Sequence, residues 1–382
     1  MDGPVWEVPT LRPTLIVAVC TLAVALSTCS SSSTSSSSST ASATSAVAPD
    51  STAAPGTNAG AGSAPSSAGS VTLHLGYFPN LTHATALVGV HAGIFAKALG
   101  PNVKLVTATF NAGPAEVQAL FSGALDAAYL GPNSAINGFT QSHGAAIVVV
   151  SGATSGGSEL VVKPSITTAV ELKGTKLATP QLGNTQDVAL RYWLKSQGLK
   201  TDTQGGGDVS IEPQANATAV TAFETGAIAG GWEPEPYATE LVQAGGHVLV
   251  DERSLWPNGH FATTVLAVTK SFLKAHPDVV KALIQGQVEA NDFVNKNPAQ
   301  AQADAAAEIA AIAGKAPSAK VISQAWRDMT FTDDPVASSF QTAADHAVAV
   351  GIGKAVNLAS LFDLTILNQV LTAAHETPVS AS

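Results

Sequence analysis

Residues 116–129 read EVQALFSGALDAAY, and residues 219–232 read AVTAFETGAIAGGW. Each stretch predicts a helix that ends at a glycine, Gly123 or Gly226, and is followed at once by a buried strand. Similar residues recur in the two stretches at a constant offset of 103. Because the same helix–strand pattern occurs twice in the sequence, we predict two lobes of similar structure.

Short apolar segments alternate with helical stretches on both sides of these units. The first series of predicted strands covers residues 71–78, 103–110, 125–131 and 145–152. The second series covers residues 172–180, 208–213, 227–234 and 246–252. Because strand, helix and strand in this order favour parallel pairing, the predicted fold class is α/β. Each lobe is expected to be a mostly parallel sheet flanked by helices, with a ligand cleft between the lobes.

The remaining sequence completes the first lobe. After the second series comes an apolar extended segment, and then Ala-rich helical sequence runs to the C-terminus. We therefore predict that lobe I is discontinuous and that two hinge crossings join it to lobe II. The predicted bounds are 71–160 plus 266–382 for lobe I, 161–265 for lobe II, and crossings near 159–163 and 263–269.

The N-terminal segment is predicted to serve export rather than folding. Residues 14–28 form an uncharged apolar run that is shorter than the roughly 20 residues of a membrane-spanning helix. It is typical of a signal peptide, predicted over residues 1–28. Leu26 to Cys29 resembles the lipobox of bacterial lipoproteins, which predicts lipidation of Cys29. Ordinary secretion and an uncleaved anchor remain alternatives.

A disordered Ser/Ala-rich tether is expected over residues 29–70, because this segment has almost nothing to bury. The expected location is therefore outside the cytoplasmic membrane, anchored to its outer face, on the periplasmic or cell-wall side. The rest of the chain contains no apolar run of membrane-spanning length.

Composition excludes several function classes. Only 12% of the residues are charged, the formal net charge is −10, and the sequence holds four Arg. A nucleic-acid binder needs a basic surface, so none is expected as a partner. Both cysteines, Cys20 and Cys29, precede the predicted fold, which excludes a disulfide, a thiolate metal site and a cysteine nucleophile there. We predict no metal and no cofactor.

The loops that follow the predicted strands are small, polar and almost free of charge. In open α/β sheets, ligands gather at such loops, where helix N-termini point free N–H groups outward. The candidate ligand-binding residues are Asn80, Thr82, His83, Gly113, Pro114, Asn133, Ser134, Ser155, Ser158, Gln181, Asn184, Thr185, Gln186, Asn216, Trp232 and Glu233. Several of the Asn and Ser residues are equally suited to cap helices, and Trp232 could belong to the core.

Four segments carry a resemblance to a known family. They are LGYFPNLTHA from Leu75, FNAGPAEVQALFSGALDAAYLGPNSAI from Phe110, QLGNTQDVALRYWL from Gln181 and GGWEPEPYA from Gly230. In this order they resemble the periplasmic substrate-binding proteins of ABC importers, in the nitrate, sulfonate and taurine branch. The resemblance implies a two-lobed type II periplasmic-binding fold. It also implies a monomer that closes on a small anion and delivers it to a membrane permease with a cytoplasmic ATPase.

The scarcity of Arg bears on the ligand. Residues 71–190 contain no Arg, so the bidentate fork that usually holds a carboxylate is missing from most of the candidate loops. Backbone N–H groups, hydroxyls and amides suit a weakly basic sulfonate better. Glu233 would then be free to meet a cationic end, such as the ammonium of taurine.

Other functions remain open at this point. Nitrate, bicarbonate and a pyrimidine precursor of thiamine are alternative ligands within the wider family. Pyrimidine-precursor synthases share the scaffold, but they depend on a cysteine-rich iron motif, and no cysteine follows Cys29. The sequence therefore favours a binding protein for an aliphatic sulfonate or a taurine-like compound over an enzyme.

Overall fold

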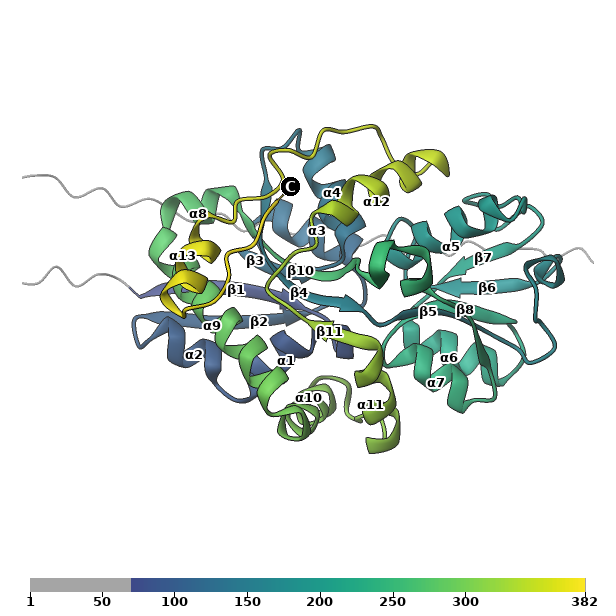
Figure 1. Ribbon diagram of the computed structural model, residues 1–382, viewed down its shortest axis with the longest axis horizontal. Helices are drawn as coiled ribbons and strands as arrows, with labels where there is room; N and C mark the ends of the chain where they lie inside the picture. The colour runs from purple at the N-terminus through teal and green to yellow at the C-terminus, as the bar shows by residue number, and fades with distance from the viewer. Residues whose placement is uncertain (1–69, 382) are drawn as a thin grey trace, which may run out of the picture. The chain divides into compact units, whose positions relative to one another are not determined.

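The computed structural model describes residues 70–381 (Figure 1). The predicted signal peptide, Cys29 and all but the last residue of the predicted tether lie outside the described residues. Two sheets organise the described part. The first has six strands in the order β11-β4-β10-β3-β1-β2. Their bounds are β1 (Val71–Tyr77), β2 (Val103–Thr109), β3 (Ala127–Leu130), β4 (Ile147–Gly156), β10 (Ala262–Thr269) and β11 (Met329–Phe331).

The first sheet is mixed rather than uniformly parallel. β1 pairs in parallel with β2, from Val71 opposite Val103 to Tyr77 opposite Thr109, and in parallel with β3. β10 is antiparallel to both β3 and β4, and β11 is antiparallel to β4. Four of the six strands therefore run in one direction. The two reversed strands belong to the chain after its return from the second sheet.

Helices cover both faces of the first sheet. One face carries Leu73, Leu75 and Tyr129, which belong to a large apolar cluster. Seven helices contribute to this cluster: α1 (Ala84–His91), α2 (Ile94–Leu99), α8 (Lys270–Ala275), α9 (Pro277–Lys296), α10 (Pro298–Ala313), α11 (Ala319–Ala325) and α13 (Thr365–Ala373). A second cluster joins the opposite face to α3 (Gly113–Ser122), α4 (Pro132–Gln141) and α12 (Ser338–Ala349). Across residues 70–381, no helix has the length and apolar character to cross a membrane.

The second sheet has five strands in the order β7-β6-β8-β5-β9. Their bounds are β5 (Ser158–Val162), β6 (Lys176–Thr179), β7 (Ser210–Pro213), β8 (Gly230–Pro234) and β9 (His247–Asp251). Only β5 opposes the other four strands in direction. Figure 1 shows α5 (Thr185–Ser196) over one face, and α6 (Asn216–Glu224) and α7 (Tyr237–Gln243) over the other. The two apolar clusters of this lobe lie between the sheet and these helices.

The repeated unit has the predicted form in both lobes. α3 ends at Gly123 and α6 ends just before Gly226, and these glycines have φ angles of 74° and 79°. Only glycine adopts this left-handed backbone conformation without strain, which explains why a glycine follows each helix. In each case a buried strand follows, β3 or β8.

The crossings between the sheets lie a few residues before the predicted ones. β4 of the first sheet runs through Gly156 and Gly157 directly into β5 of the second. The chain returns between β9 and β10, so residues 263–269 already belong to the first sheet. The crossing lies earlier than predicted because β4 extends beyond its apolar residues to Gly156 and continues into β5 without a helix in between. We retain the division into two lobes on this basis, with lobe II formed by the second sheet and its helices.

Candidate functional site

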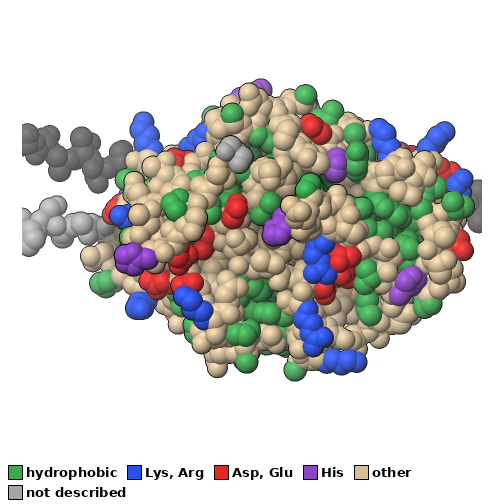
Figure 2. All heavy atoms as spheres, in the orientation of Figure 1, with side chains coloured by type: hydrophobic (Ala, Val, Ile, Leu, Met, Phe, Trp, Pro, Cys, Tyr) green, Lys and Arg blue, Asp and Glu red, His purple; other side chains and the backbone are tan. Residues whose placement is uncertain are grey.

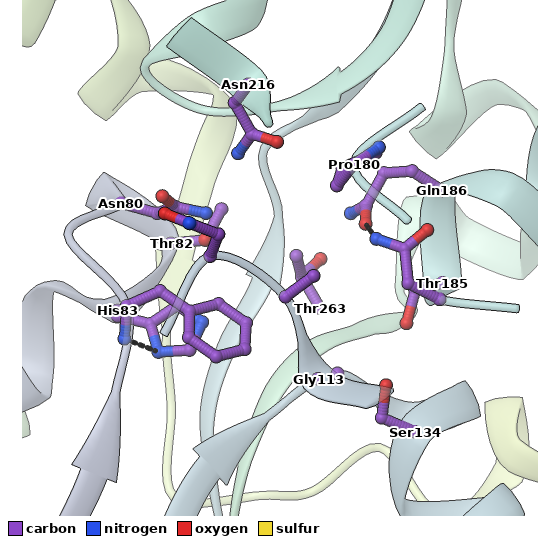
Figure 3. A pocket seen from close by; sticks show the side chains of 15 residues that line it. Asn80, Thr82, His83, Gly113, Ser134, Pro180, Thr185, Gln186, Asn216 and Thr263 are labelled. Carbon is purple, nitrogen blue, oxygen red and sulfur yellow. Dashed lines mark hydrogen bonds between the residues drawn. The ribbon is translucent and has the colours of Figure 1, made fainter. Parts of the chain in front are cut away.

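A narrow cavity lies between the two lobes (Figure 3). Its lining comes from loops after strands of both sheets and from the first turns of the helices that follow. The lining residues are Phe78, Asn80, Thr82, His83, Asn111, Ala112, Gly113, Gly131, Ser134, Pro180, Asn184, Thr185, Gln186, Asn216 and Thr263. We call this space the head cavity.

Helix N-termini converge on the head cavity. Lobe I contributes the residues that lead into α1, the start of α3 at Gly113 and the start of α4 after Gly131. Lobe II contributes the first residues of α5 and α6, Thr185 and Asn216. The first N–H groups of a helix have no intrahelical partner and carry partial positive charge. Five such termini around one cavity favour a negatively charged ligand.

Two side chains in the cavity hold polar atoms without a hydrogen-bond partner among the described residues. These atoms are Thr185 Oγ1 and Asn216 Oδ1, and both are buried. Leaving a buried polar atom unpaired costs about 1–3 kcal/mol, so a ligand that bonded to these groups would recover that cost. Their place at the cavity wall makes them candidate contacts for a ligand.

Close backbone approaches shape the wall. A Cβ placed on Gly131 of lobe I would lie 2.4 Å from Thr185 Oγ1 of lobe II. A Cβ on Gly113 would lie 2.2 Å from Ser134 Oγ. Neither glycine has a positive φ. Space, rather than backbone conformation, is therefore what requires glycine at both positions.

Among the described lining residues, only His83 carries an imidazole, and this imidazole is neutral. The side chain is 2% exposed, and burial lowers the pKa of His83 to about 3. The Phe78 backbone N–H donates to His83 Nδ1 over 3.3 Å, which places the ring proton on Nε2. The His83 ring also packs against Phe78, with 4.3 Å between ring centroids. His83 can therefore offer one neutral N–H donor to a ligand.

The head cavity carries no formal charge, because its described lining contains no Lys, Arg, Asp or Glu. The nearby Arg191 lies two turns into α5, where it is buried and pairs with Asp187 at 2.9 Å between Nε and Oδ2. On the face shown in Figure 2, charged side chains lie scattered over the outer surface. Any anion in this cavity must be held by dipoles, hydroxyls and amides.

The structure brings nine of the predicted site residues together around the head cavity. They are Asn80, Thr82, His83, Gly113, Ser134, Asn184, Thr185, Gln186 and Asn216. Among these, Asn184 also caps α5: its Oδ1 accepts from the Asp187 N–H at 2.9 Å, and its Nδ2 donates to Gln186 Oε1. The capping role of Asn184 is confirmed, and its role in ligand binding stays a prediction. Asn80 and Asn216 make no capping bond to the helices that they precede or begin.

Seven predicted site residues lie outside the head cavity. Pro114 and Gln181 are in the first turn of α3 and in the loop before α5. Asn133 donates to the Ala343 carbonyl at 3.1 Å. Ser155 and Ser158 lie on the continuous β4–β5 chain rather than on a loop, and their hydroxyls accept from Phe261 N–H and Trp232 Nε1.

Trp232 and Glu233 are fully buried beside each other on β8. The Trp232 ring packs in the lobe II core against Trp193, and its Nε1 donates to Glu252 Oε2 at 2.8 Å. The alternative that Trp232 is a core residue therefore matches its position. Burial raises the pKa of Glu233, whose carboxyl has no hydrogen-bond partner among the described residues.

Six lining residues were not predicted: Phe78, Asn111, Ala112, Gly131, Pro180 and Thr263. All except Thr263 flank predicted site residues in the same loops, so a wider reading of each loop would have included them. Thr263 lies on β10, after the return to the first sheet. Only the antiparallel insertion of β10 between β3 and β4 brings it to the cavity.

Residues 70–381 contain no group of three or more His, Cys, Asp or Glu side chains that could hold a metal ion.

Comparisons with known proteins agree with this geometry. Residues 66–312 match the model of the NMT1-like family. A Brucella abortus protein named only as a binding protein is 29% identical over 51% of this chain and 58% of its own length. The taurine-binding periplasmic protein of Escherichia coli is 28% identical over 53% of this chain and 61% of its own length. The chain thus spans about three fifths of the length of these curated relatives.

Solved structures match over a larger share of the chain. The periplasmic aliphatic sulphonate binding protein of Escherichia coli has a TM-score of 0.60 at 23% identity, over 76% of this chain and 92% of that one. The relatives named here are binding proteins, and none is named as an enzyme. The chain therefore belongs to the NMT1-like family and has the two-lobed fold of periplasmic binding proteins.

Proposed function

We propose that this protein binds a small organic anion outside the cytoplasmic membrane and delivers it to an ABC importer. The ligand that fits best is an aliphatic sulfonate or a taurine-like compound. The observation that carries the proposal is the convergence of five helix N-termini on an uncharged cavity between two lobes. Partial positive charge from the backbone can hold an anion there without an opposing formal charge.

The choice of a sulfonate over a carboxylate rests on the donor set. The head cavity offers single donors such as Thr185 Oγ1, His83 Nε2 and helix N–H groups, and its described lining includes no guanidinium. A carboxylate is usually held by two parallel bonds from one Arg. A sulfonate presents three oxygens of low basicity, which separate donors on several helices can meet one by one.

The names of relatives support this ligand class. One relative is a taurine-binding periplasmic protein, and one structural neighbour binds aliphatic sulphonates. An export signal over residues 1–28 and a lipid anchor at Cys29 would hold the protein at the outer face of the membrane, where a permease could receive the ligand. Both of these features lie outside the described residues.

Binding and delivery are coupled by closure in this proposal. The head cavity is completed by both lobes, so a ligand that contacts Ser134 and Thr185 together favours the closed arrangement. The two crossings, at Gly156–Gly157 and between β9 and β10, would serve as the hinge. The permease would then recognise the closed form.

A thermal-shift screen of the purified full chain tests the ligand class. The candidates are alkanesulfonates, taurine, nitrate, bicarbonate and aminopyrimidines. We expect the melting temperature to rise with sulfonates, because a ligand that binds only the folded state stabilises it. A rise with aminopyrimidines alone, or with nitrate alone, would replace the sulfonate assignment.

A further inference from the structure

A carboxylate of the chain itself lies in the first turn of α5. Asp187 is the third residue of this helix and is fully buried. Its Oδ2 accepts from the Gly183 N–H at 2.9 Å, so the carboxylate lies beside the loop that leads into the helix. A negative charge at this place offsets the partial positive charge of a helix N-terminus. Asp187 would therefore oppose an anion that binds at the same terminus.

This terminus belongs to the head cavity. Thr185 and Gln186, the first two residues of α5, line the cavity, as Figure 3 shows. A helix leaves the N–H groups of its first residues without an intrahelical partner. Asp187 is the next residue along the chain, although it does not line the cavity. An anion at these N–H groups and the Asp187 carboxylate would therefore share one helical turn.

Arg191 supplies a positive charge that cancels the charge of Asp187. Its Nε donates to Asp187 Oδ2 at 2.9 Å, and its Nη1 donates to the Asp202 carbonyl at 2.6 Å. The side chains of Arg191 and Asp187 are 2% and 0% exposed. Among the ion pairs that residues 70–381 form, only this one has both side chains buried. Salt and water therefore screen this pair little.

Stability alone does not account for a buried ion pair of this kind. Apolar residues of similar size often stabilise a fold as well or better, because both charges of a pair must be taken out of water. Arg191 Nη2 also has no hydrogen-bond partner among the described residues. Charge balance at the start of α5 is a reason for Arg191 that packing does not supply.

The other helices that begin at the head cavity have no uncancelled charge in their first turn either. α1, α4 and α6 have no acidic residue there, whereas α3 has Glu116. Glu116 is fully buried, and its oxygens have no hydrogen-bond partner among the described residues. Burial raises the pKa of Glu116 well above its usual value, which favours the neutral carboxyl. In α3 a proton thus does what Arg191 does in α5.

We propose that Arg191 is a positioning residue for anion binding: it holds the Asp187 carboxylate and cancels its charge, which leaves the N-terminus of α5 free to attract the ligand. Arg191 does not line the head cavity, so it acts through Asp187 and not by contact. The inference rests on the proposed function, because it requires an anion at the start of α5. It adds a residue on which the affinity for that anion depends.

Titration calorimetry of the purified full chain with an alkanesulfonate tests the inference. Arg191→Met leaves Asp187 without its cation, and the affinity should fall by about fivefold or more, the effect of one charge near a partly buried helix N-terminus. Asp187→Asn leaves the cation alone, and the affinity should rise by about the same factor. The double variant Asp187→Asn/Arg191→Met has neither charge, and its affinity should lie within about threefold of the wild-type value.

Three further variants separate charge from structure. Lys296→Met removes the cation of another pair four residues apart, Asp292 and Lys296 on α9, and should keep the wild-type affinity because neither residue lines the head cavity. Thr179→Val removes a hydroxyl that donates to Asp187 Oδ1 at 3.0 Å, and it should also keep the affinity because no charge changes. Arg191→Lys retains the positive charge and should bind more tightly than Arg191→Met.

The order of affinities decides the inference. If the pair served structure alone, both single variants and the double variant would all bind more weakly than the wild-type protein. An affinity in Asp187→Asn equal to or below the wild-type value would overturn the inference, and this test remains if Arg191→Met does not fold. A double variant that binds at least fivefold more weakly than the wild-type protein would also overturn it. If no alkanesulfonate binds to the wild-type protein, the proposed function itself fails, and this result is distinct from the other two.

Discussion

Gly131 lies at the point where lobe I meets Thr185 of lobe II. Because a Cβ at residue 131 would sit 2.4 Å from Thr185 Oγ1, Gly131→Ala should hinder closure around a ligand. The φ of Gly131 is −74°, so alanine adds no backbone strain. We predict an affinity for alkanesulfonate that is lower by about tenfold or more, with an unchanged melting temperature without ligand. Calorimetry and thermal unfolding check this prediction, and full affinity in Gly131→Ala would contradict it.

For single residues, the sequence predicts which loops line the cavity better than it predicts which side chains point into it. Asn80, Thr185 and Asn216 were found from their places after strands, because the position of a helix N-terminus can be read from the sequence. Thr263 was not found, since only the insertion of β10 between β3 and β4 in the folded chain brings it to the cavity.

At the scale of elements, α5 of lobe II and α12 of lobe I form a direct contact between the lobes. The rings of Tyr192 and His346 stack with 3.5 Å between centroids and an interplanar angle of 12°. Lys195 also donates to the Ala349 carbonyl at the end of α12. Closure therefore depends on the C-terminal helices as well as on the ligand.

Tyr192→Ala should weaken this contact. We predict that the affinity for ligand falls by about three- to tenfold, chiefly through faster dissociation, because an aromatic pair contributes about 0.5–1.5 kcal/mol. Stopped-flow measurement of the dissociation rate checks the prediction. Gln341→Ala, on the exposed side of α12, is the control and should change nothing. An unchanged dissociation rate in Tyr192→Ala would show that the contact does not hold the lobes together.

The β4–β5 crossing shows why some elements escape sequence reading. Residues 154–158 are small and Gly-rich, which is the composition of a loop, and we predicted ligand-binding residues there. In the structure, β4 pairs with β10 and β11, and β5 pairs with β8 and β9. These pairings make the whole segment extended. These partners are far away in the sequence, so local composition could not reveal the strand.

Across the whole molecule, several buried carboxyls have raised pKa values, and buried His83 has a lowered one. These shifts have opposite effects on how stability depends on pH. Burial raises the pKa of Glu159 to about 8 and the pKa values of Glu235, Glu252 and Asp333 to about 7. Since these groups bind protons more tightly when folded, their contribution to stability is present at low pH and is lost as pH rises through 7–8. Because the pKa of His83 is lowered, His83 reduces the stability of the folded protein as the pH falls below about 6.5.

We therefore predict that the unliganded protein is more stable near pH 5.5 than at pH 8.5. Each unit of pH in this window changes the free energy of unfolding by about 1.4 kcal/mol for every proton by which the folded and unfolded states differ. Urea denaturation across this range measures the trend. In Glu159→Gln the slope should be smaller, and a wild-type protein that gains stability toward pH 8.5 would contradict the account.

Uncharged donors from both lobes are proposed to hold an anion in the head cavity, and Thr185→Val removes one of these donors. The substitution keeps the shape of the side chain and removes a hydroxyl that has no hydrogen-bond partner among the described residues. Thr179→Val is the matched control, because its hydroxyl bonds Asp187 at 3.0 Å outside the cavity. Titration calorimetry with an alkanesulfonate should show one saturable site in the wild-type protein and in Thr179→Val. In Thr185→Val the affinity should be lower by about ten- to a hundredfold, because a hydrogen bond to a charged group contributes about 1.5–3 kcal/mol. Equal affinity in Thr185→Val and the wild-type protein, or no binding of any alkanesulfonate, would contradict the claim.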